Sequence, residues 1–162
     1  HSTKCDQIHG LHKIVGNARH PVVCGFDPSP CHKENSVCRL IFPDKGDASF
    51  HHLALEQIPE HYAVCFSVSD QPWLTRETIR GLVTAFRKNT RGMVCASWEG
   101  MDGNPVIFAP EYRKELLALS GDVGGRKVLL AHPEDVARFV AGSSRELADV
   151  DEKSQLCYNQ ND

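Results

Sequence analysis

The sequence has no long apolar run, no long basic run and no paired cysteine motif. A helix that spans a bilayer needs roughly 18 to 20 consecutive apolar residues, and no stretch of the 162-residue chain approaches that length. A net charge of −3 without clustered Lys and Arg gives no electrostatic case for nucleic-acid binding. The first residues are not followed by the apolar stretch of a signal peptide. We therefore expect a cytoplasmic protein that binds neither membranes nor nucleic acids.

Several motifs of nucleotide-binding and hydrolytic enzymes are also missing. The chain contains neither a P-loop nor a G-x-G-x-x-G fingerprint, and it has no G-x-S-x-G elbow of a serine hydrolase. Seven cysteines are an odd number that does not fit a complete disulfide framework. The Cys and His residues within residues 5–38 lack the C-x2-C spacing of common zinc sites, so a structural metal is disfavoured. Cys65 and Cys95 lie in apolar runs and are expected to be reduced.

From about residue 49 onward, strand-like and helix-like segments alternate. Residues 62–68 form a continuous apolar run of strand length, which favours a central strand that is covered on both faces. Thr75 is expected to cap a helix with the apolar stripe Ile79, Leu82, Val83 and Phe86. Such alternation predicts an α/β sheet. The other expected elements are strands at 22–24, 37–42, 93–98, 105–108 and 135–141, and helices at 50–58, 110–119 and 126–132.

Asp70 directly follows the buried strand, in Ser69-Asp70-Gln71-Pro72. Open α/β sheets bind ligands beyond the carboxyl ends of their strands, and Mg²⁺ prefers one or two carboxylates plus phosphate oxygens. A carboxylate at this position therefore suits a nucleotide–metal complex. The alternative is that Asp70 only caps the following turn, because Asp is a common turn residue. Position alone does not decide between the two.

Two other acidic segments are open to functional and structural interpretations. Asp122 lies among glycines in residues 121–125, where the backbone can approach a ligand or form an anion-binding concavity. A tight turn is the simpler alternative, since glycine usually marks turns. Asp149 and Asp151 share one side of the chain if their segment is extended. They can bind a cation, but solvation explains them without one.

Four motifs in order resemble those of the molybdenum cofactor cytidylyltransferases and their MobA-like relatives. Residues 66–75 resemble the family's strand-D-Q-P-x-L-T block, and residues 103–108 its G-x-P-v-l-F block. Residues 116–124 are similar to the L-x-x-L-x-G-D-x-G block, and residues 147–151 to the terminal l-x-D-I-D segment. Each motif alone is weak, but four in the family's order and spacing, over about residues 46–156, are fairly specific.

The resemblance implies a fold, a reaction and a set of site residues. The fold is a Rossmann-like three-layer sandwich with a mostly parallel sheet, and the reaction is transfer of CMP from CTP (or GMP from GTP) to molybdopterin with Mg²⁺. Asp70 would be catalytic and bind the metal, and Asp122 would help to hold the metal or the pterin. The residues expected to bind nucleotide or pterin are Ser69, Gln71, Pro72, Gly103, Asn104, Pro105, Gly121 and Gly124. A molybdenum hydroxylase that receives the cofactor is a further expected partner.

The family's opening L-A-A-G-x-S-x-R-M-G segment, which holds the triphosphate, has no counterpart in residues 1–45. The final D-I-D-T also differs, with Glu152 in place of Thr. We therefore expect residues 1–162 to form a single MobA-like domain without its N-terminal nucleotide-binding loop, which is encoded upstream or has diverged. Because phosphoryl-type transfer depends on positioning and charge stabilisation, this loss threatens activity. Two alternatives stay open: a non-catalytic binding protein for nucleotide or molybdopterin, and a nucleotidyltransferase for a sugar or alcohol phosphate.

Overall fold

The computed structural model describes residues 21–26, 54–68, 70–119 and 124–150. In this part of the chain five strands form one sheet in the order β1-β2-β4-β3-β5. The strands are β1 (Pro21–Phe26), β2 (Ala63–Val68), β3 (Met93–Trp98), β4 (Met101–Phe108) and β5 (Val136–Val140). The helices are α2 (Arg76–Lys88), α3 (Arg113–Leu117) and α4 (Arg126–Ala131), and the 3₁₀ segments are η2 (Pro110–Tyr112), η3 (Pro133–Asp135) and η4 (Ser144–Leu147). Residues 54–57 are also helical.

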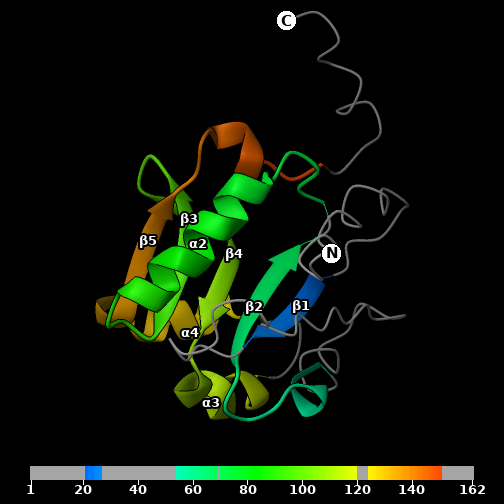
Figure 1. Ribbon diagram of the computed structural model, residues 1–162, viewed down its shortest axis with the longest axis vertical. Helices are drawn as coiled ribbons and strands as arrows, with labels where there is room; N and C mark the ends of the chain where they lie inside the picture. The colour runs from blue at the N-terminus through cyan, green and yellow to red at the C-terminus, as the bar shows by residue number, and fades with distance from the viewer. Residues whose placement is uncertain (1–20, 27–53, 69, 120–123, 151–162) are drawn as a thin grey trace, which may run out of the picture.

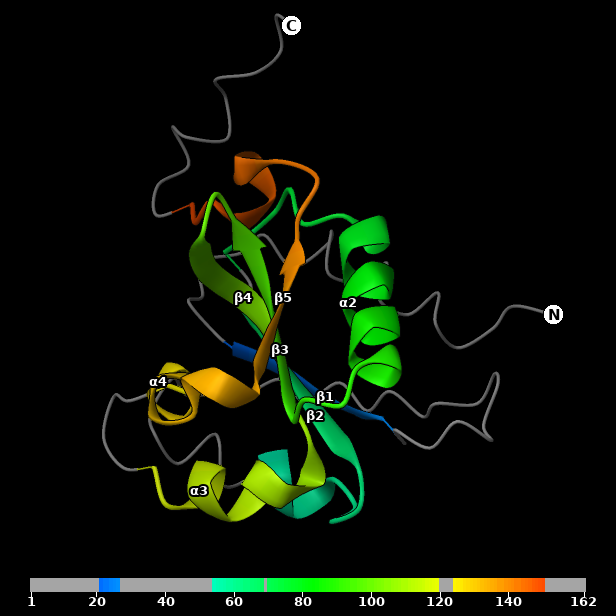
Figure 2. The same ribbon diagram turned by 90° about the vertical axis from the view of Figure 1, so that its left-hand side faces the viewer.

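The sheet lies between helices. Figure 2 shows α2 along one face and α4 on the other. The contacts agree with this view, because Gly81 of α2 lies against the ring of Phe139 in β5, and Gly125, which precedes α4, lies against Phe108 in β4. Helices on both faces of a sheet place the protein in the α/β class that the alternating sequence pattern predicts.

The sheet is mixed, so the expectation of a mostly parallel sheet is wrong. β3 pairs with β5 in parallel, whereas the pairs β1–β2, β2–β4 and β3–β4 are antiparallel. A tight turn explains the β3–β4 pair. Glu99 and Gly100 have φ values of 48° and 82°, and positive φ at both central residues is the geometry of a two-residue hairpin. So short a connection permits only antiparallel pairing.

Three strands nevertheless point the same way. Because β4 is antiparallel to both β2 and β3, and β3 is parallel to β5, the carboxyl ends of β2, β3 and β5 meet at one edge of the sheet. We call this the carboxyl edge, and the opposite one the amino edge. In Figure 1 the arrowheads of β2 and β5 both point to the upper end of the molecule, which is the carboxyl edge.

The core is centred on the sheet and the inner side of α2. Among the residues with no or almost no exposure are Leu82, Met93, Ile107 and Phe108. Thr75 caps α2 as predicted, since its hydroxyl oxygen accepts a hydrogen bond from the N–H of Thr78. Leu82 and Phe86 of the predicted apolar stripe are buried, whereas Ile79 and Val83 are partly exposed.

Three other sequence expectations can be placed. Cys65 and Cys95 are free and buried, as expected for cysteines in apolar runs. The expected strand at 37–42 lies outside the described residues. In the part of the chain that the structure describes, no helix is both long enough and apolar enough to cross a bilayer.

Candidate functional site

Two segments that are distant in sequence meet at the carboxyl edge: residues 70–75, which we call the Asp70 loop, and residues 142–150, which we call the terminal segment. The backbone oxygen of Asp70 accepts a hydrogen bond from the N–H of Val150 at 2.8 Å. Figure 1 shows η4, within the terminal segment, next to the start of α2. The site expected around Asp70 is therefore bounded on one side by the terminal segment.

Gln71 connects the two segments through its side-chain amide. The side chain is buried, with 8% of the residue exposed. Its Nε2 donates hydrogen bonds to the backbone oxygen of Leu147 and to Oδ1 of Asp149, both at 3.1 Å. Because both amide hydrogens have acceptors, the direction of the amide oxygen is fixed. That oxygen, Oε1, is buried and has no hydrogen-bond partner among the described residues.

A buried acceptor without a donor costs about 1–3 kcal/mol. Gln71 Oε1 therefore gives the carboxyl edge a hard oxygen atom that a hydrogen-bond donor or a cation would satisfy. Pro72 lies next to it in the turn, which is closed by a hydrogen bond of 3.3 Å from the N–H of Leu74 to the backbone oxygen of Gln71. Sequence reasoning placed Gln71 and Pro72 in the site, and the structure puts both at the expected edge.

Asp149 is exposed to solvent, as its simplest interpretation predicts. The hydrogen bond from Gln71 adds a feature that composition did not indicate, because it holds one carboxylate oxygen next to the Asp70 loop. The signal that pointed to this residue was the resemblance of residues 147–151 to the family's terminal motif. Asp70 and Asp149 thus supply two carboxylates to the same edge.

The expected acceptor block, Gly103-Asn104-Pro105, lies in β4, with Gly103 and Asn104 in the half of the strand next to this edge. A Cβ atom on Gly103 would lie 3.4 Å from Cδ1 of Leu147, whose backbone oxygen accepts the hydrogen bond from Gln71. Leu147 therefore contacts both predicted blocks. The peptide bond between Asn104 and Pro105 is cis, and Pro105 is fully buried.

Glu146 is a residue of this edge that sequence reasoning missed. Only 6% of it is exposed. Its carboxylate accepts hydrogen bonds from the N–H of Thr75 at 3.1 Å, from the hydroxyl of Thr75 at 2.8 Å, and from the N–H of Gly142 at 3.0 Å. Burial works to raise its pKa, but hydrogen bonds from Thr78, Thr75 and Gly142 outweigh burial and hold the pKa below the ordinary value of 4.5. Glu146 is therefore a buried charge at neutral pH, next to the favourable amino end of α2.

The start of β4 is braced by an ion pair. Arg138 of β5 donates from Nε to Oδ1 of Asp102 at 2.7 Å and from Nη2 to Oδ2 at 2.9 Å. Hydrogen bonding to Arg138 holds the pKa of Asp102 below its usual range, with a smaller contribution from the charge of Arg126. Between them, burial and the charge of Asp102 raise the pKa of Cys95 to about 12. The thiol stays protonated at neutral pH, so it is no nucleophile.

Gly124 is not brought together with the other predicted residues. The next residue, Gly125, lies against Phe108, at the opposite end of β4 from Gly103. Ser69, Gly121, Asp122 and Asp151 are outside the described residues. Within the described ranges, no group of three or more His, Cys, Asp or Glu side chains is arranged to hold a metal ion by itself. Two carboxylates are nevertheless enough for Mg²⁺ when phosphate oxygens and water complete its shell.

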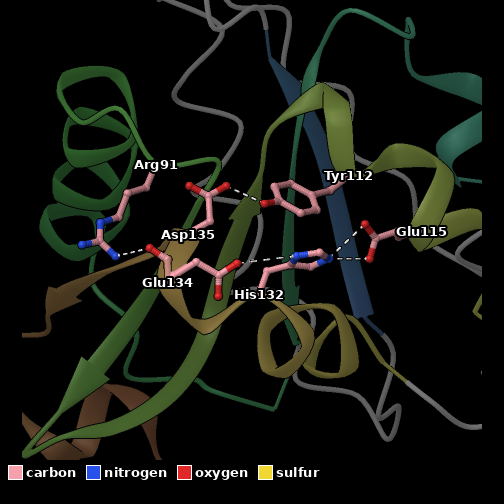
Figure 3. Close-up of polar contacts among 6 residues, drawn as sticks. All are labelled: Arg91, Tyr112, Glu115, His132, Glu134 and Asp135. Carbon is pink, nitrogen blue, oxygen red and sulfur yellow. Dashed lines mark hydrogen bonds and ion pairs between the residues drawn. The ribbon is translucent and has the colours of Figure 1, made fainter.

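A second polar cluster lies at the amino edge, and Figure 3 shows it. The hydroxyl of Tyr112 donates to Oδ2 of Asp135 at 2.5 Å, and Nε2 of His132 lies 2.8 Å from Oε2 of Glu115. Arg91 donates to the backbone oxygen of Val136 at 3.2 Å. These groups satisfy one another and tie the start of β5 to the segments around it, which indicates a structural role.

A comparison with family models identifies a domain. The model described as the MobA-like NTP transferase domain matches residues 11–136. The match includes the Asp70 loop and all of β4, and it ends before the terminal segment. No curated protein matches the chain.

Proposed function

Because the chain belongs to the MobA-like NTP transferase domain family, we propose that it transfers CMP from CTP to molybdopterin. Family membership makes it a nucleotidyltransferase that uses a nucleoside triphosphate. The choice of CTP and molybdopterin is supported by the resemblance of residues 103–108 to the cytidylyl branch. The observation that carries the proposal is that the Asp70 loop, the Gly103 block and the terminal segment meet around Leu147.

The proposed reaction is a displacement at phosphorus. A phosphate oxygen of molybdopterin attacks the α-phosphorus of CTP, a new P–O bond forms there, and the bond to the β-phosphate oxygen breaks to release pyrophosphate. Both reactants are anions, so the protein must position them and offset their charge. A site with fixed oxygen donors at one edge of a sheet is suited to that task when a cation lies between the donors and the phosphates.

The donors at the carboxyl edge fit Mg²⁺. The carboxylates of Asp70 and Asp149 and the amide oxygen of Gln71 are hard oxygen ligands of the kind that Mg²⁺ prefers. When bound, Mg²⁺ would neutralise charge that develops on the phosphate oxygens. In this proposal Asp70 is the catalytic metal-binding residue, Gln71 orients Asp149, and Gly103, Asn104 and Pro105 shape the acceptor side.

The test is a pyrophosphate-release assay with Mg²⁺, molybdopterin and each nucleotide. We expect release with CTP, and we expect Asp70→Asn to lower turnover by roughly 100-fold or more, since it removes a charge opposite the phosphates without changing the size of the side chain. Glu115→Gln at the amino edge serves as the control and should leave turnover unchanged. Release with GTP alone would reassign the nucleotide, and release with a sugar phosphate instead of molybdopterin would reassign the acceptor.

A non-catalytic binding protein is the second candidate, because residues 1–45 contain no counterpart of the family's triphosphate loop. Such a protein would hold molybdopterin or nucleotide for delivery to a molybdenum hydroxylase. It would show binding by isothermal titration calorimetry without pyrophosphate release, and Asp70→Ala would leave delivery intact. An enzyme would lose nearly all turnover in the same variant.

A further inference from the structure

Glu146 makes a connection that no other buried carboxylate among the described residues makes. Its Oε2 accepts from the backbone and the hydroxyl of Thr75, the last residue of the Asp70 loop. Its Oε1 accepts from Gly142, the first residue of the terminal segment. One carboxylate therefore joins the two segments, and the residue numbers of Thr75 and Glu146 differ by 71.

The other links between these segments include two hydrogen bonds to backbone oxygens, from Nε2 of Gln71 to Leu147 and from the N–H of Val150 to Asp70. A further hydrogen bond from Gln71 ends on an exposed carboxylate, that of Asp149. Arg145 lies over the ring of Trp73 with its Cζ 4.6 Å from the ring centroid, and such contacts are worth about 0.5–1 kcal/mol at exposed sites. Hydrogen bonds to a charged group contribute about 1.5–3 kcal/mol each. Among the described residues, Glu146 is thus the buried acidic residue that links the two segments, and it does so through two hydrogen bonds from Thr75.

We propose that Glu146 is a positioning residue, which fixes the Asp70 loop against the terminal segment and so sets the relation between Asp70 and Asp149. The proposal rests on the proposed function in one respect, namely that these two carboxylates serve a metal–nucleotide complex. Glu146 itself does not touch the substrate. It acts through Thr75 on one side and through the short stretch from Glu146 to Asp149 on the other.

The variant Glu146→Gln tests this role with little change in volume. Both carboxylate oxygens accept from N–H groups, Oε2 from Thr75 and Oε1 from Gly142. A Gln amide has only one acceptor oxygen, so either orientation places its NH₂ group opposite one of these donors. The variant therefore loses either the bond from Thr75 of the Asp70 loop or the bond from Gly142 that orients the side chain within the terminal segment.

Asp135→Asn is the matched control. Asp135 lies before β5, at the amino edge (Figure 3), whereas Glu146 lies after it. Like Glu146, it accepts from a side-chain hydroxyl, that of Tyr112, and from a backbone N–H, that of Gly92. A loss of stability that comes only from replacing a hydrogen-bonded carboxylate by an amide should be similar in the two variants. An effect on the site should occur in Glu146→Gln alone.

Two measurements on the full chain separate the outcomes. The first is the affinity for Mn²⁺, used as a probe in the presence of CTP and measured by electron paramagnetic resonance well below both melting temperatures. We expect it to weaken about tenfold in Glu146→Gln, which is the lower range for residues that support metal ligands, and to change less than about twofold in Asp135→Asn. The second is hydrogen exchange at the amide of Val150, which donates to Asp70 and should lose protection only in Glu146→Gln.

Specific loss of Val150 protection together with weaker Mn²⁺ binding supports the positioning role. Equal changes in the two variants, at equal loss of melting temperature, overturn it and leave Glu146 a purely structural residue. If the wild-type protein binds no Mn²⁺ with CTP, the proposed function fails. The exchange of Val150 then still decides whether Glu146 holds the Asp70 loop, because that measurement needs no metal.

Discussion

At the scale of the single residue, Glu146 couples stability to pH. Its pKa in the folded protein lies below the ordinary value of 4.5. Its contribution is therefore fully present above that value and is lost as the pH falls through the lower, folded-state pKa. We expect the free energy of unfolding, measured in urea, to fall more steeply in the wild type than in Glu146→Gln between about pH 5 and pH 3.

At neutral pH the same variant should be less stable than the wild type by about 1–3 kcal/mol, because a buried donor is left without an acceptor. Parallel pH profiles for the two proteins would argue against a lowered pKa of Glu146. A steeper loss of stability in the wild type than in the variant on acidification would agree with it.

Single residues also show what the sequence predicts about position. Asp70, Gln71 and Gly103 were expected in the site because each belongs to a short motif, and the structure places all three at the carboxyl edge. Their roles stay predictions. Glu146 was not expected there, because its partner Thr75 is 71 residues away and nothing around Glu146 distinguishes it from a surface carboxylate. The missed residue is the one whose role depends entirely on tertiary contacts.

At the scale of the element, the packing of α2 against β5 leaves no room for a side chain at Gly81. A Cβ atom at Gly81 would lie 2.1 Å from Cζ of Phe139 in β5. Alanine is favoured over glycine in helices by about 1 kcal/mol. At residue 81 the overlap of the new methyl group with the ring should outweigh this gain, so the substitution should lower the free energy of unfolding. We expect Gly81→Ala to destabilise the protein by about 1–2 kcal/mol in urea unfolding.

A second substitution checks the cause of that effect. Phe139→Leu shortens the side chain that the new methyl group would meet, so the cost of Gly81→Ala should become small or turn favourable in the Phe139→Leu background. An unchanged cost in that background would show that the contact with Phe139 does not limit residue 81.

The elements differ in how well their sequence predicted them. β2, β3 and α2 were placed within one or two residues, because an apolar run and a capped apolar stripe are strong local signals. Only residues 105–108 of β4 were expected to form a strand, and residues 99–103 were expected to form a turn, because Gly and Asp are typical turn residues. Pairing with β3 through the two-residue hairpin overrides that preference and extends the strand to Met101.

At the scale of the whole molecule, the direction of the strands determines which features of the sheet the sequence could predict. Asp70 was expected beyond the carboxyl end of its strand, and it lies at the carboxyl edge of the mixed sheet because β2, β3 and β5 still run in one direction. The motif at residues 116–124 does not join it, since Gly125 lies against Phe108 at the opposite end of β4. The insertion of β4 between β2 and β3 is a tertiary pairing that no local pattern indicates.

The whole molecule should also respond to its ligands. A ligand that binds only the folded state stabilises it by about 2.7 kcal/mol at a hundredfold excess over its Kd. We expect CTP with Mg²⁺ to raise the melting temperature of the wild type in a thermal-shift measurement, and to have no such effect on Asp70→Asn. A similar rise in both proteins would place nucleotide binding away from Asp70.

The hydrogen bonds that hold the Asp70 loop have a consequence for how the protein is made. The loop leaves the ribosome before the terminal segment, whose Glu146 is 71 residues further along the chain than Thr75. Until that segment emerges, the nascent chain contains Asp70 but neither Asp149 nor Glu146. The carboxyl edge is therefore completed only after every described strand of the sheet has been synthesised.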